Sequence, residues 1–108
     1  MSEQQAPPGV IPYVEFHTGE RRVLTVHLTS GNGMLTSKVP PVVSIDGRQY
    51  VVYWGSVSFE VPADRAVHLS VHVEGAHLGQ AATALLPPGG ALALTYRTDF
   101  LSGVGSLG

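Results

Sequence analysis

Apolar and polar residues alternate along most of this chain, beginning at Tyr13. Leu24, Val26 and Leu28, for example, fall on one side of their segment, and Thr25, His27 and Thr29 fall on the other. A period of two is typical of a strand with one buried face, and helical periods do not appear. The alternation therefore predicts half-buried strands, most clearly over Val23–Thr29, Val57–Val61 and Val67–Val73.

Residues that favour turns separate these segments. Asp46-Gly47 is the strongest hairpin signal, because Asp and Gly accept the positive φ angles that a two-residue hairpin requires. It predicts that Val42–Ile45 pairs with Gln49–Trp54. Further turns are expected at Ser30–Gly33, Pro62–Arg65 and Pro87–Gly90, and further strands at Tyr13–Thr18, Gln80–Leu86 (also compatible with a short helix) and Leu92–Tyr96.

The chain is short enough for one domain, and its strands are close together. About seven or eight short strands, spaced roughly 8–12 residues apart, predict an all-β antiparallel β-sandwich. We expect a flexible N-terminal segment over residues 1–12, the sandwich over residues 13–99 and a Gly-rich C-terminal tail over residues 100–108. The apolar tail could dock on the domain rather than form a strand.

Residues 42–75 contain a strand that ends in Asp46-Gly47, a second strand, a turn at Pro62 and an alternating strand, His68–Val73. This arrangement resembles the PEGA-like family of small β-domains and, more broadly, uncharacterised small β-domain proteins of actinobacteria. The resemblance implies an Ig-like or PEGA-like sandwich that acts as a non-catalytic surface or accessory module. Relatives of this kind often lie beside membrane helices, and the resemblance transfers no catalytic residues.

Composition narrows the function classes. Charged residues make up 13% of the chain, against about 25% in an average protein. The net charge is -2 with 6 basic residues, so we expect no nucleic-acid partner. With 0 cysteines, disulfide scaffolds and thiolate zinc sites are excluded. Few surface charges favour self-association or a partner protein, although a coding bias toward Ala, Gly and Val would also explain them.

The start of the chain has no basic residues and no apolar core of a secretory signal, and no apolar run reaches the length of a membrane span. These features predict a cytoplasmic protein.

The segment Gln49–Trp54 has bulky residues on both faces. Tyr50, Val52 and Trp54 alternate with Val51 and Tyr53, whereas a solvent-facing strand should alternate with polar residues. A protein interface at Tyr50, Val51, Tyr53 and Trp54 would explain this, because aromatic residues are enriched at interfaces. A carbohydrate platform, or a central strand with Trp54 in the core, would also explain it.

Four histidines are candidates for a metal or pH-sensing cluster: His17, His27, His68 and His72. His68 and His72 share a strand face but lie about 13 Å apart at about 3.3 Å per residue, so they cannot hold one metal ion by themselves. A cluster requires the strands that carry these histidines to be neighbours. Otherwise the histidines serve as polar residues on solvent-facing strand surfaces.

Catalytic patterns are weak in this chain. The carboxylates are scattered over turns and outward positions, and Gly103–Ser106 lacks the spacing of a nucleophile motif. We therefore predict a non-enzymatic protein-interaction or assembly module without a cofactor, which forms a homo-oligomer or binds another protein. The alternatives are a small-ligand domain that binds carbohydrate or metal, and a peripheral membrane domain that uses the apolar tail.

Overall fold

The computed structural model describes residues 9–13, 16–30, 39–74, 78–99 and 104–108, which form nine strands and no helix. This confirms the all-β prediction. The strands are β1 (Val10–Ile11), β2 (Arg21–Ser30), β3 (Pro41–Ile45), β4 (Arg48–Val51), β5 (Gly55–Pro62), β6 (Val67–Glu74), β7 (Leu78–Leu86), β8 (Leu92–Asp99) and β9 (Val104–Leu107).

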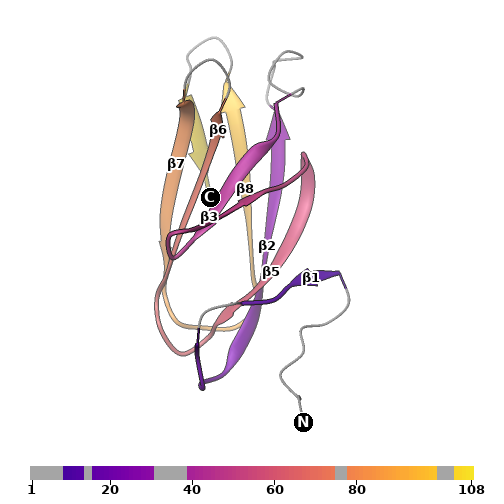
Figure 1. The fold of residues 1–108 in the computed structure, drawn as a ribbon. Coiled ribbons are helices and arrows are strands. Elements are labelled where there is room, and N and C mark those ends of the chain that lie inside the picture. The colour runs from indigo at the N-terminus through magenta and orange to yellow at the C-terminus, as the bar shows by residue number, and fades with distance from the viewer. Residues whose placement is uncertain (1–8, 14–15, 31–38, 75–77, 100–103) are drawn as a thin grey trace.

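Two sheets pack against each other (Figure 1). The first sheet has the order β1-β5-β2-β8-β9, and the second has the order β4-β3-β6-β7. Most neighbouring strands are antiparallel, whereas β1 pairs with β5 and β2 pairs with β8 in parallel. The molecule is therefore a β-sandwich that is rich in antiparallel pairs.

The core lies between the sheets and consists of the inward rows that the alternation predicts. Leu24, Val26 and Leu28 of β2 are buried. In the register, Leu24 lies opposite Phe59 of β5, so apolar side chains from adjacent strands share one face. The second sheet contributes equivalent buried residues, including Val43, Ile45, Leu69 and Val71. Facing rows of this kind remove apolar surface from water, which is the main favourable term in folding.

The β3–β4 hairpin forms at the predicted turn. Asp46 has a φ of 48° and Gly47 a φ of 91°, so both central residues are left-handed, as a type I′ turn requires. Ile45 and Arg48 close the loop as the first cross-strand pair. The return strand is shorter than predicted, because β4 ends at Val51 and not at Trp54.

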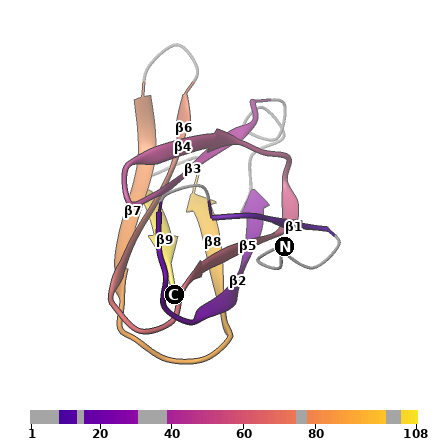
Figure 2. The same cartoon turned by 60° about the horizontal axis from the view of Figure 1, so that its bottom comes forward.

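The N-terminal part of the fold differs from the prediction. Tyr13 and residues 16–18 lie outside any strand, so the described residues do not form the strand expected over Tyr13–Thr18. Val10–Ile11, within the segment predicted to be flexible, instead forms β1 and pairs with β5 (Figure 2). Ile11 packs against the core. Residues 1–8, and the glycines of the turn expected after Ser30, lie outside the described residues.

The C-terminal tail also differs. Val104–Leu107 forms strand β9 antiparallel to β8, whereas the pattern predicted no element there. Gly108 extends the ladder through two backbone hydrogen bonds with Thr95, both 3.0 Å long. Leu107 packs against the core. The apolar side chain of Leu107 is therefore used inside the sandwich rather than offered to a membrane.

Candidate functional site

Strand β4 forms one edge of the second sheet and has β3 as its neighbour. Antiparallel pairs alternate between hydrogen-bonded and non-hydrogen-bonded residues. The Val52 amide donates to the Pro41 carbonyl at 3.1 Å, so Val52 and Pro41 are a hydrogen-bonded pair. Counting back two residues at a time, Tyr50 and Arg48 are also hydrogen-bonded to β3. By the same alternation, the backbone N–H and C=O groups of Gln49 and Val51 point away from the sheet. They form an open edge to which another strand could pair.

The four residues predicted to form an interface divide between two sides of this edge. Val51 is 70% exposed and Tyr53 is 89% exposed, so both are available to a partner. Tyr50 and Trp54 are half-buried and pack against the core. The predicted alternation of this segment is therefore correct, and its outer face carries the two exposed residues.

Tyr50 and Trp54 support the edge from inside. The Tyr50 ring lies 5.4 Å from the Phe59 ring between centroids, with a tilt of 59°. Trp54 stacks on Tyr96 with ring centroids 6.3 Å apart, and its indole Nε1 donates to the Val39 carbonyl at 2.9 Å. These contacts fix the backbone around Val51 and Tyr53, so the exposed side chains extend from a well-anchored segment.

A mainly apolar hollow of about 300 Å³ lies beside the edge. Its walls combine Val51, Val52, Tyr53 and Trp54 with residues from two other strands, Ile11 of β1 and Ser56 and Val57 of β5. The sequence identified Val51, Tyr53 and Trp54 as interface candidates. It did not identify the other lining residues, and it missed Ile11 because the proline-marked N-terminal segment was predicted to be flexible. We call this hollow, together with the open edge of β4, the β4 edge site.

The outer face of the second sheet continues from this site. The register places the following side chains on it, of which Val42 and His72 are themselves buried: Val42, Ser44, Gln49, Val51, His68, Ser70, His72, Ala81, Thr83 and Leu85. None of these described side chains belongs to Asp, Glu, Lys or Arg. Leu85 of β7, at the far side of the same sheet, is 68% exposed. Over these positions, which stop short of Glu74 at the end of β6, the face places little electrostatic barrier before a second protein surface.

The histidines do not form the cluster considered from the sequence. His27 lies on the first sheet, where its Nδ1 is 2.7 Å from the Ser56 hydroxyl. His68 and His72 lie on the second sheet, and the strands that carry them are not neighbours of β2. The Nε2 of His17 lies 3.0 Å from the Asp64 carboxylate, outside the strands. Among the described residues, no group of three potential ligands could hold a metal ion.

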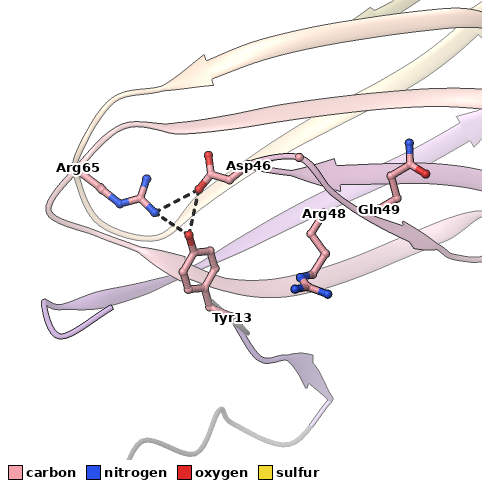
Figure 3. A pocket seen from close by; sticks show the side chains of 6 residues that line it. Tyr13, Asp46, Arg48, Gln49 and Arg65 are labelled. Carbon is pink, nitrogen blue, oxygen red and sulfur yellow. Dashed lines mark hydrogen bonds and ion pairs between the residues drawn. The ribbon is translucent and has the colours of Figure 1, made fainter. Parts of the chain in front are cut away.

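A polar cluster, which the sequence did not predict, joins Tyr13, Asp46 and Arg65 (Figure 3). The Tyr13 hydroxyl donates to Asp46 Oδ2 at 3.1 Å and accepts from Arg65 Nη2 at 2.6 Å. Arg65 Nη2 also lies 3.3 Å from Asp46 Oδ2, and Asp46 Oδ1 accepts from the His68 amide at 2.9 Å. The cluster ties the β3–β4 turn to the N-terminal segment and to the start of β6.

The electrostatics of this cluster keep the Tyr13 hydroxyl protonated. Burial raises the pKa of Tyr13, and the hydrogen bond and negative charge of Asp46 raise it further, while Arg65 acts in the opposite direction. A protonated hydroxyl can donate to the carboxylate, which stabilises the turn. The three residues are 19 to 52 positions apart in pairs, so no local pattern signals their contact.

Comparison with protein-family models, curated proteins and solved structures gives no match. The resemblance of residues 42–75 to PEGA-like domains therefore stays a prediction. Within the described part of the chain, no helix has the length and apolar character needed to cross a bilayer.

Proposed function

We propose that this chain is a non-enzymatic assembly module that associates with a second copy of itself through the β4 edge site. The observation that carries the proposal is the exposure of Val51 and Tyr53 beside backbone groups that point away from the sheet. Pairing with another strand would satisfy those backbone groups, and burying the two side chains would add about 25 cal/mol for each Å² of apolar surface.

A two-fold pair of β4 strands is compatible with the charges at this edge. In an antiparallel pair centred on Tyr50, Arg48 of one copy lies opposite Val52 of the other. The two arginines therefore do not face each other. The low net charge of -2 adds little long-range repulsion between copies. A two-fold contact uses the same patch on both copies, which is the commonest symmetry of protein oligomers.

Two lysine substitutions on the same face of the second sheet test this proposal. Val51→Lys places an ammonium group in the contact, and Leu85→Lys makes a similar change on β7, away from β4. We expect Val51→Lys to weaken association by about tenfold or more, because burying an unpaired charge costs more than about 1.4 kcal/mol. Leu85→Lys should leave it unchanged. Light scattering over a range of protein concentrations measures the effect.

Either of two results would contradict the proposal. A wild-type mass of 11.4 kDa at every concentration would mean that the chain does not self-associate. Equal weakening by both lysine substitutions would instead place the contact on the flat face of the second sheet rather than at the β4 edge site.

The exposed ring of Tyr53 beside the apolar hollow favours a second candidate, a small ligand such as a carbohydrate. An aromatic ring offers an apolar face on which a sugar can stack. A native-state ligand raises the midpoint of thermal unfolding. Simple glycans should raise the Tm of the wild-type protein and not that of Tyr53→Ser, and an absence of any shift would reject this candidate.

A further inference from the structure

Arg22 occupies an unusual position for a charged residue. In the register it lies opposite Val61, and it belongs to the same face of β2 as Leu24 and Val26. It therefore lies on the inner side of the first sheet, and it is only 7% exposed. Arginine is rarely this buried unless it is paired.

The contacts of Arg22 use only part of the hydrogen-bonding capacity of its guanidinium group. Nε donates to the Pro62 carbonyl at 3.0 Å. Nη2 is buried and has no hydrogen-bond partner among the described residues. The adjacent Arg21 differs, because its Nη1 makes a 2.9 Å ion pair with Glu60. A buried charge without a counter-charge is costly, so the Arg22 guanidinium favours an anion.

A cavity of about 500 Å³ gives an anion a place beside this guanidinium. Arg22 lines it together with Ala63, which follows β5. The turns after β5 and β7 lie at the lower end of the sandwich in Figure 1. Gly89, Gly90 and Ala91 of the β7–β8 turn form part of its wall. A Cβ atom on Gly89 would lie 3.6 Å from Nη1 of Arg22, so the glycine leaves open the space next to that nitrogen.

We propose that this cavity binds a compact oxyanion, the carboxylate or phosphate group of a small molecule, with Arg22 as its counter-charge. A guanidinium binds such groups through paired N–H···O bonds. Glu20 and Glu60 also line the cavity, and they disfavour ligands of high negative charge such as nucleic acids. The proposal is independent of the β4 edge site, because the two sites share no residue.

The first test titrates the protein with inorganic phosphate and, separately, with acetate in a Tris buffer, against sodium chloride at equal ionic strength. We expect one of the two oxyanions to raise Tm in a saturable way and to shift the Gly89 amide resonance and the Arg22 Nε–H resonance. The more effective anion identifies the group as phosphate or carboxylate. If neither anion acts beyond chloride, the proposal is wrong.

Three substitutions locate the effect. Arg22→Met removes the charge and keeps the apolar length of the side chain, and we expect it to abolish the saturable rise in Tm. Gly89→Ala keeps the charge but fills the space near Nη1, so it should weaken binding by about tenfold. Arg97→Met is the control, because it removes one positive charge from an exposed position outside the cavity. It should respond to anions as the wild type does.

The same variants distinguish a ligand site from a purely structural arginine. Replacing a buried, uncompensated charge with an apolar residue is often neutral or stabilising. We therefore expect Arg22→Met, in chloride alone, to have a Tm equal to or above that of the wild type. If Arg22→Met still responds to anions as the wild type does, the proposal is overturned. If Arg22→Met does not fold, Gly89→Ala decides, and an unchanged anion response in that variant would overturn the proposal.

Discussion

At the scale of single residues, Tyr96 carries a hydroxyl group into the core. Its side chain is fully buried in β8 and stacks with Trp54. Burial disfavours the charged phenolate and raises the pKa of Tyr96 from 10.0 to about 12. The folded protein therefore holds this proton at pH values where the unfolded chain has already lost it.

The Tyr96 hydroxyl predicts a loss of stability in alkali. Below pH 10, burial of the neutral Tyr96 side chain contributes fully to the free energy of unfolding. Between pH 10 and about 12 this contribution is lost, because Tyr96 ionises in the unfolded chain and not in the folded protein. The loss should be on the order of 2 kcal/mol. Urea denaturation at increasing pH measures it, and tyrosinate absorbance follows the ionisation.

Two phenylalanine variants control this measurement. Tyr96→Phe should reduce the alkaline slope and leave the part that Tyr13 contributes, whereas Tyr53→Phe, which removes an exposed hydroxyl, should keep the wild-type slope. The same slope in wild type and Tyr96→Phe would mean that another group governs alkaline stability.

At the scale of elements, the strands that the sequence predicts are those whose signals are local. Strands β2, β5 and β6 alternate along their own length, and Asp46-Gly47 specifies its turn through two residues. These features need no knowledge of distant partners. The prediction over Val23–Thr29, for example, lies entirely within β2.

Strands β1 and β9 could not be predicted in this way. β1 has two residues and β9 has four, one of them Gly105, which weakens any local preference for a strand. They form because β5 and β8 offer hydrogen-bonding edges and the core accepts Ile11 and Leu107. Tertiary pairing thus decides both ends of the domain.

Two adjacent residues of β9 should differ in their effect on stability. Leu107 packs against the core, and Ser106 is exposed on the outer face. Leu107→Ala should lower the free energy of unfolding by about 1–3 kcal/mol, whereas Ser106→Ala should change it by less than about 0.5 kcal/mol. Chemical denaturation of the full chain compares them. Equal effects would mean that β9 is held by its backbone and not by Leu107.

At the scale of the whole molecule, the two sides of the sandwich differ. On one side β7 and β9, the edge strands of different sheets, lie side by side. On the other side β4 is an edge strand that borders the apolar hollow. The sequence placed Val51 and Tyr53 together on one strand face, but it could not show that their strand lies at an edge. Edge position depends on the order of all strands, and that order decides whether the face is a surface or a core.

Sites assembled from distant segments are also invisible in the local sequence pattern, because they depend on how the strands and turns pack. The Tyr13, Asp46 and Arg65 cluster and the Arg22 cavity each join several elements through space. For Arg22, the alternation around Leu24 and Val26 already implied an inward position, which was the available signal. The surroundings that leave its guanidinium short of a partner follow only from the packing of the turns.

Amide hydrogen exchange at β4, followed over a range of protein concentrations, tests the proposed self-association most directly. The Gln49 and Val51 amides point away from the sheet, whereas the Tyr50 amide faces β3 and serves as an internal control. We predict that exchange at Gln49 and Val51 slows as concentration rises, while Tyr50 stays protected throughout. Fast exchange at Gln49 and Val51 at every concentration would contradict pairing through this edge.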